Sequence, residues 1–282
     1  MLSILMVLAV ALVLTGIGWS VVARLDPGDR LSDGEKIVFS FLTGGYATYF
    51  GVFFIGLVRL DVLTMAVLAF VCVLAAIPGL RAFPWKSVFD FYAGILGAGN
   101  FSTLLLIAVI AVAASSLLQG LAPPNDYDSL LYHLSIPLHD IEMGRIVVPN
   151  DARGAQALFP AMTSNLTRFL LVFTDGETAQ IAHGSYGIAV AAGAGLMVRR
   201  FGYGVNVALI AALFFLVIRG VVWQMASAET DIPLATFSIA AFISYLAWRE
   251  HRVAGLGVLF GLMIGGMILT KYTGFAVALS FG

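Results

Sequence analysis

Two aspartates in one short polar segment are the residues best suited to chemistry. Asp126 and Asp128 follow the pair Pro123-Pro124, directly after an apolar stretch. A carboxylate held there could remove a proton from an acceptor hydroxyl or amine, or bind a divalent cation. The alternative is structural, because an Asp at the start of a helix accepts backbone N–H bonds as an N-cap. Two acids two residues apart cannot both cap one helix.

The segment after these aspartates has the pattern of an amphipathic helix. Over residues 129–143, apolar side chains alternate with polar ones that include Tyr132 and His133. We expect a helix lying along the membrane surface, kinked near Pro137 and ended by Gly144. Tyr132 and His133 would then lie next to the two aspartates and could contact a substrate.

Zinc and thiol chemistry are not expected. His133 and His139 are six residues apart, a spacing that does not place them on one face of a helix. The sequence holds one cysteine, Cys72, inside an apolar run. It therefore provides neither a disulfide framework nor a thiol-based metal site.

A second acidic point lies farther along the chain, at Glu229 and Asp231. These residues stand between two apolar stretches, where carboxylates of membrane proteins tend to face a cavity or a partner. The structural alternative is again a cap, because Pro233 follows near the first turn of the next helix. We expect both acids on the same side of the membrane as Asp126 and Asp128.

Two cations stand near the ends of apolar stretches, Lys271 and Arg219. Either side chain could reach the interface as a simple anchor. Either could equally bind a lipid-linked phosphate through its charge. The sequence leaves both possibilities open for each residue.

Composition determines the elements that must position these residues. The 282 residues are 60% hydrophobic and 11% charged, whereas a soluble domain carries about 25% charged residues. This high hydrophobic and low charged fraction excludes a soluble fold. A net charge of −1 without a basic stripe argues against a nucleic-acid partner. We predict an all-α polytopic membrane protein with eight spans near 1–23, 37–58, 61–80, 101–121, 178–198, 204–222, 231–248 and 254–271.

Basic residues orient these spans. If the N-terminus is outside, nine Lys and Arg residues fall in cytoplasmic positions and six outside, among them the short-loop pairs Arg199/Arg200 and Arg249/Arg252 on the cytoplasmic side. Residues 156–173 are apolar enough to suggest a ninth span but contain Pro160, Asn165 and Arg168, and counting them as a span would reverse both pairs. We place them as an interfacial or re-entrant helix, so that residues 122–177 form one long extracytoplasmic segment.

Several short patterns together resemble the integral-membrane GT-C glycosyltransferases, in particular the bacterial branch similar to protein O-mannosyltransferases and lipid A aminoarabinose transferases. The resemblance covers roughly residues 101–275. Its pieces are Asp128 with Tyr132 four residues on, the amphipathic helix ending in Gly144 with Pro149 beyond it, Thr230-Asp231-Ile232-Pro233-Leu234, and the glycine-rich run from Gly261-Leu262 to Thr270-Lys271-Tyr272.

The resemblance implies a sugar donor attached to a polyprenyl phosphate, an outward-facing site in the cell (inner) membrane, and Asp128 as base or metal contact, with Asp126 as the alternative. Residues 1–100 would be an N-terminal group of three spans. Residues 101–282 would be a catalytic core that lacks its C-terminal part, since the chain ends within a new apolar run. The main alternative is a transporter or flippase of a lipid-linked or amphipathic solute. Transporters usually place ionisable groups near the midplane on broken helices.

Overall fold

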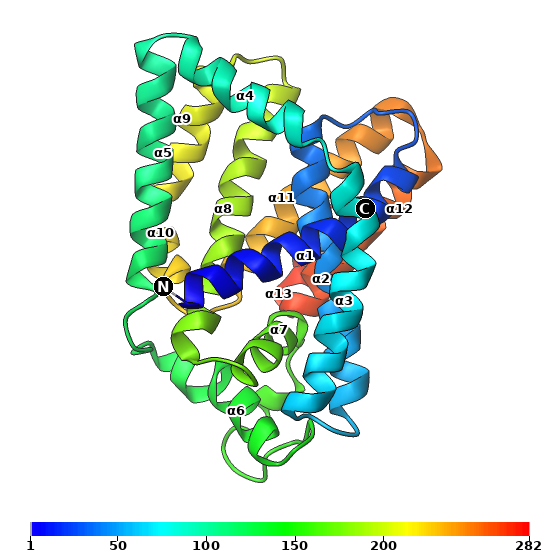
Figure 1. The fold of residues 1–282 in the computed structure, drawn as a ribbon, viewed down its shortest axis with the longest axis vertical. Coiled ribbons are helices and arrows are strands. Elements are labelled where there is room, and N and C mark those ends of the chain that lie inside the picture. The colour runs from blue at the N-terminus through cyan, green and yellow to red at the C-terminus, as the bar shows by residue number, and fades with distance from the viewer. Residues whose placement is uncertain (1, 282) are drawn as a thin grey trace.

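The computed structural model describes residues 2–281, which form helices and no β-strand (Figure 1). The prediction of an all-α polytopic membrane protein is confirmed, because six helices are long and apolar enough to cross a membrane. Each continuous apolar run satisfies its own backbone hydrogen bonds as a helix. The six are α1 (Leu2–Leu25), α2 (Asp33–Gly56), α3 (Val62–Ala82), α5 (Asn100–Gln119), α8 (Gly176–Arg200) and α11 (Asp231–His251).

The predicted span at 204–222 is wrong as one continuous helix. The chain there forms α9 (Val205–Leu216) and α10 (Arg219–Met225), whose axes are bent by 73° at the break. Ile218 has an extended backbone (ψ 120°), which interrupts the helical hydrogen bonds. The last predicted span, α12 (Ala254–Thr270), has 17 residues, or roughly 25 Å at 1.5 Å per residue, against a hydrocarbon core of about 30 Å.

Helix α4 (Trp85–Gly97) joins α3 to α5 and lies across one end of the molecule (Figure 1). Its apolar side chains recur at helical spacing, and those of Trp85, Phe89 and Leu96 are exposed, while Ile95 is buried. The opposite side of the helix carries Ser87. Such a helix has the pattern of an interfacial element and not of a span.

The long segment between α5 and α8 contains only short helices: a π-helical turn (Ser129–His133), α6 (Ser135–Glu142), a 3₁₀ turn (Gln156–Leu158) and α7 (Met162–Leu171). The helix expected over 129–143 is thus irregular, and the irregularity precedes Pro137 because proline has no N–H for the carbonyl of His133. Gly144 follows α6 with φ +69°, a conformation that favours glycine, as expected. Helix α13 (Thr273–Leu279) follows α12.

Helix α7 does not cross the membrane, since its ten residues are too short. It is not an amphipathic surface helix either, because nearly all of its side chains are buried. It packs against α2, α6 and α8. Burial inside protein permits a half-length helix at membrane depth.

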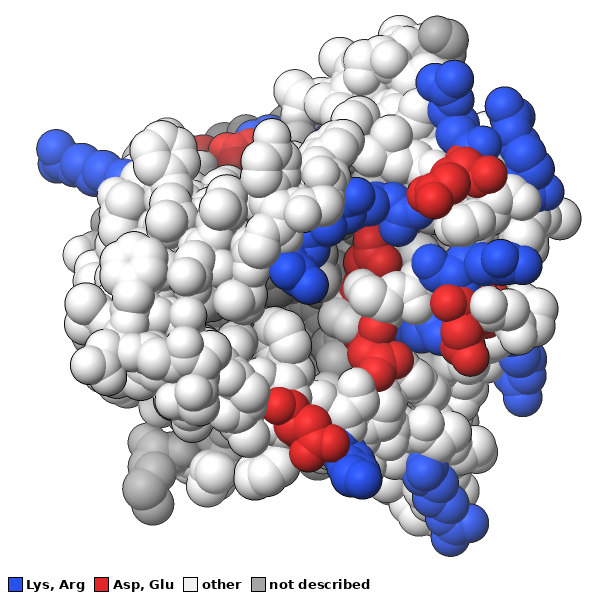
Figure 2. All heavy atoms as spheres, turned by 90° about the horizontal axis from the view of Figure 1, so that it is seen from above, with Lys and Arg blue, Asp and Glu red and all other residues white. Residues whose placement is uncertain are grey.

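The helix ends define two opposite faces. The cavity face comprises residues 57–61, 120–175, 226–230 and 271–272, and backbone bonds tie its parts together, such as Leu60 N–H to Gly144 O (2.7 Å) and Ile146 N–H to Gly56 O (2.7 Å). The ion-pair face comprises residues 26–32, 83–99, 201–204 and 252–253. Acidic and basic side chains lie interleaved over one side of the ion-pair face (Figure 2).

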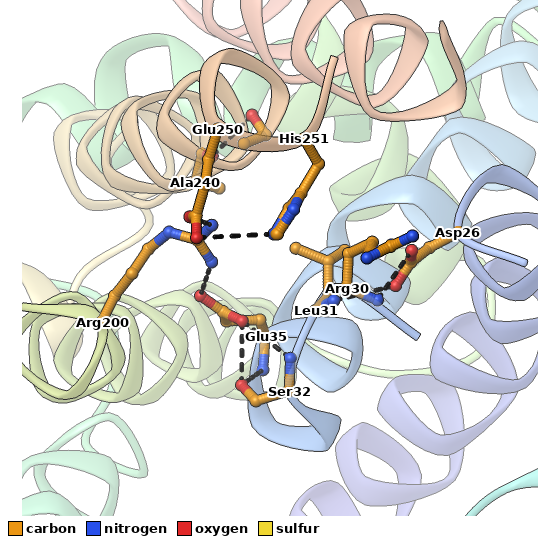
Figure 3. A network of polar contacts seen from close by, with 10 residues as sticks. Asp26, Arg30, Leu31, Ser32, Glu35, Arg200, Ala240, Glu250 and His251 are labelled. Atoms are coloured by element: carbon orange, nitrogen blue, oxygen red, sulfur yellow. Dashed lines mark hydrogen bonds and ion pairs between the residues drawn. The ribbon is translucent and has the colours of Figure 1, made fainter. Parts of the chain in front are cut away.

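On the ion-pair face, Arg200 at the end of α8 contacts Glu35 of α2 (2.9 Å) and Glu250 of α11 (2.8 Å) (Figure 3). Glu35 also completes a capping box with Ser32. Nearby, Asp26 accepts the N–H groups of the turn before α2. These contacts join the ends of three spans.

Helices α1 and α2 cross at van der Waals distance because both present glycine. A Cβ atom at Gly18 would lie 1.8 Å from the carbonyl oxygen of Ser40, and one at Gly44 would lie 1.8 Å from that of Leu14. Small residues allow such approach in membrane bundles. One hydrophobic core cluster runs from α1 to α12, so the segments on either side of residue 100 share it.

Candidate functional site

The polar segment after α5 is fixed to α8. Gln180 of α8 donates from Nε2 to the carbonyl oxygens of Gly120 (3.1 Å) and Ala122 (2.9 Å), and Pro124 packs against Gly176. These bonds satisfy carbonyls that the end of α5 leaves without partners. They place the following aspartates beside the start of α8.

The two aspartates have different roles in the local structure. The Asp126 carboxylate accepts the N–H of Ser129 (2.9 Å) and so caps the π-helical turn. Asp128 makes no capping bond with its side chain. The expectation that Asp128 sits at the helix start is confirmed, but the capping bond belongs to Asp126.

The second acidic point meets the first, as expected. The Ser129 hydroxyl accepts the N–H of Ala228 (3.0 Å), and the carbonyl of Glu229 accepts from Nδ1 of His183 in α8 (3.0 Å). The Glu229 side chain is buried and lies close to that of Asp126. Residues about a hundred positions apart thus form one cluster.

Burial and neighbouring charge alter the protonation of this cluster. Burial, followed by the charge of Asp126, raises the pKa of Glu229 to about 7. Burial and then the charge of Asp128 raise the pKa of Tyr132 to about 12. Burial is also the main cause that lowers the pKa of His133 to about 3, so this imidazole is neutral. A carboxyl whose pKa is raised beside other acids is typical of sites with acid–base chemistry.

Asp231 and Lys271 form an ion pair. Asp231 begins α11, Lys271 follows α12, and Gln224 of α10 donates to the second carboxylate oxygen of Asp231 (3.1 Å). Both charged side chains are partly exposed. The pair brings Lys271 next to the acidic cluster.

A cavity of about 230 Å³ lies beside the cluster. Its walls come from the π-helical turn, the 3₁₀ turn, the first turns of α7 and the junction of α12 with α13. The side chains that line it include Tyr132, His133, Gln156, Phe159, Ser164, Arg168, Lys271 and Tyr272, and no Asp or Glu. The carboxylates therefore stand behind one wall, and the cations face the interior.

Sequence reasoning missed Arg168 and Asp140 as partners. Arg168 contacts the Asp140 carboxylate through Nε and Nη2, both at 2.7 Å, and donates from Nη1 to Asn165 (2.8 Å). Asp140 is fully buried and also accepts the N–H of Val147 (2.9 Å). A charged residue inside the apolar run 156–173 was the only sequence signal for this pair.

Arg219 is not brought to the cavity. It is exposed at the start of α10 and lines a separate hollow with Gly220 and Trp223. Within residues 2–281 no group of three or more His, Cys, Asp or Glu residues is arranged to hold a metal ion.

Comparison with protein-family models, curated proteins and solved structures finds no match for this chain. The function must be argued from the site.

Proposed function

We propose that this protein is a membrane glycosyltransferase that moves a sugar from a polyprenyl-phosphate donor to an acceptor at the extracytoplasmic face. One observation carries the proposal: a cluster of four acids, two of them buried, adjoins a cavity whose charged lining is only cationic. A glycosyl transfer needs a base for the acceptor and positive charge for the departing phosphate. The cluster and the cavity would provide these two environments side by side.

In this proposal Asp128 is the base. It has no capping role, and it lies beside the side chain of Tyr132, which lines the cavity. The acceptor O–H or N–H would give its proton to Asp128 while its heavy atom bonds to the sugar carbon. The bond from that carbon to the phosphate oxygen breaks, and the polyprenyl phosphate leaves with the electron pair. Lys271 would stabilise the charge on that phosphate.

The remaining members of the cluster would hold the base and the sugar. Asp126, which lies close to Glu229, caps the turn from which Tyr132 projects. Asp231 positions Lys271, and the neutral His133 at the cavity wall would contact the donor. The outward orientation of the cavity face rests on the excess of basic residues at the opposite face.

A transporter of a lipid-linked or amphipathic solute is the second candidate. The break between α9 and α10 and the half-length helix α7 favour it, because broken helices often bind transported solutes. The four acids, however, lie in loops and at helix starts of the cavity face and not at mid-span. This position is the reason to prefer the enzyme.

The test incubates the purified protein with labelled polyprenyl-phosphate sugars and follows consumption of the donor. We expect Asp128→Asn to lower turnover by about 10² to 10⁴-fold, the usual contribution of an oriented base. Asp151→Asn is the matched control, because Asp151 is in the same long segment but pairs with Arg153 away from the cluster. Near-normal turnover by Asp128→Asn would refute the assignment of Asp128 as the base. Movement of intact donor between leaflets, without consumption, would establish the transporter instead.

A further inference from the structure

Helix α7 directs its uncapped N-terminus at the cavity. Ala161 precedes the helix without any side-chain cap, and no acidic residue stands in the first turn. The first bond of the helix runs from Asn165 N–H to Ala161 O (2.9 Å), so the N–H groups of residues 162–164 have no acceptor within the helix. Ala161 and Ser164 line the cavity. Free N–H groups at a helix start, with the positive end of its dipole, favour an anion.

Arg168 stands one turn farther along the same side of α7 and also lines the cavity. It is 4% exposed, so its charge is not solvated by bulk water. A guanidinium has five N–H donors, and the bonds to Asp140 and Asn165 use three of them. One N–H on each Nη atom remains for a ligand.

Lys271 and His133 line the same cavity from elements other than α7. His133 is 7% exposed and has no hydrogen-bond partner within residues 2–281, although it is buried and polar. A ring nitrogen of His133 is therefore available to a ligand in the cavity that this residue lines.

We propose that the first turn of α7, Ser164, Arg168 and Lys271 form an anion site for the phosphate of a prenyl-phosphate lipid. The α7 N–H groups and the two Arg168 donors would bind the phosphate oxygens, together with Lys271 and His133. The absence of Asp and Glu from the cavity lining removes repulsion. This inference rests on the proposed function and names the subsite that would hold the donor headgroup.

The test measures binding of geranylgeranyl monophosphate to the full chain in detergent, with geranylgeraniol as the uncharged control and inorganic phosphate as competitor. Ser164→Asp introduces a negative charge at the third position of α7, where acids stabilise a helix, so folding is preserved. Ser164→Asn is the matched neutral variant of the same size. Arg168→Lys is a weaker second test, since it keeps the charge and loses the fork of donors.

We expect the phosphate lipid to bind, the alcohol not to bind, and Ser164→Asp to weaken binding by about tenfold or more, the effect of losing one charge-assisted bond. Ser164→Asn should bind within about twofold of the parent protein. Competition by inorganic phosphate would identify the bare anion as sufficient, and its failure to compete would show that the lipid tail is needed; both support the site. Equal binding of alcohol and phosphate, or no loss in Ser164→Asp, would overturn it. Intact binding of the phosphate lipid without any sugar transfer would support the anion site and refute only the proposed glycosyltransferase activity.

Discussion

The raised pKa of Glu229 predicts a specific dependence of stability on pH. Folding raises the pKa of this carboxyl from its ordinary value of 4.5 to about 7. At 1.36 kcal/mol per unit this corresponds to roughly 3 kcal/mol between the protonated and ionised forms. Protonated Glu229 favours the folded state, so its contribution to the free energy of unfolding is complete below pH 4.5. That contribution is lost as the pH rises through about 7.

Glu229→Gln should remove this dependence, because glutamine mimics the protonated carboxyl at every pH. We expect the variant and the parent protein to be equally stable near pH 4.5. Near pH 8 the variant should be the more stable by up to roughly 3 kcal/mol, or about 5 to 10 °C in the denaturation midpoint. The assay is thermal denaturation in detergent across pH 4.5 to 8.

The difference between the two proteins is the quantity to follow, since His133 titrates over part of the same range in the opposite sense. Its lowered pKa means that the unfolded chain takes up a proton below about pH 6.5 while the folded chain does not. The parent curve alone therefore mixes both effects. Glu142→Gln, an exposed acid in the same long segment, should leave the curve unchanged. A Glu229→Gln curve parallel to that of the parent would refute a shifted carboxyl.

Three other predictions follow from the contacts. Asp140→Asn should destabilise the protein by about 3 to 5 kcal/mol, since it leaves the buried Arg168 charge uncompensated, and denaturation in detergent would show whether it does. Arg219→Gln should leave both prenyl-phosphate binding and donor turnover unchanged; a loss of either would place Arg219 at the site. A spin label at Phe89 should be more accessible to membrane-dissolved oxygen than one at Ser87, and equal accessibility would mean that α4 does not lie in the interface.

Six spans could be predicted from the sequence because an unbroken apolar run of about 20 residues is itself the physical requirement for crossing a bilayer. The break at Ile218 could not, since Val217 and Ile218 are as apolar as their neighbours and the bend depends on packing. Helix α4 was missed because Lys86 interrupts the apolar window. The recurrence of Trp85, Phe89 and Leu96 at helical spacing would have revealed it.

The acidic residues of the candidate site could be predicted from the sequence, but the hydrogen bonds and ion pairs of the site could not. Asp126 and Asp128 were equivalent in sequence, and only the bond to Ser129 N–H distinguishes the capping carboxylate from the free one. Asp140 and Arg168 are 28 residues apart, and no local rule pairs residues at that separation. Such pairings arise from tertiary packing of the long segment against α2 and α8.

Helix α8 connects the two faces and explains how short, irregular segments can form an ordered site. At its first turns Gln180 and His183 bind the backbone of the loops that carry Asp126 and Glu229. At its last turn Arg200 pairs with α2 and α11, and Figure 3 shows both carboxylates turned toward the guanidinium. Because α8 is one unbroken helix, its residues keep fixed positions relative to one another. The contacts of Arg200 therefore also constrain where Gln180 and His183 lie along the helix axis. The contacts at its two ends thus make α8 a continuous link between the ion pairs of one face and the loops of the other.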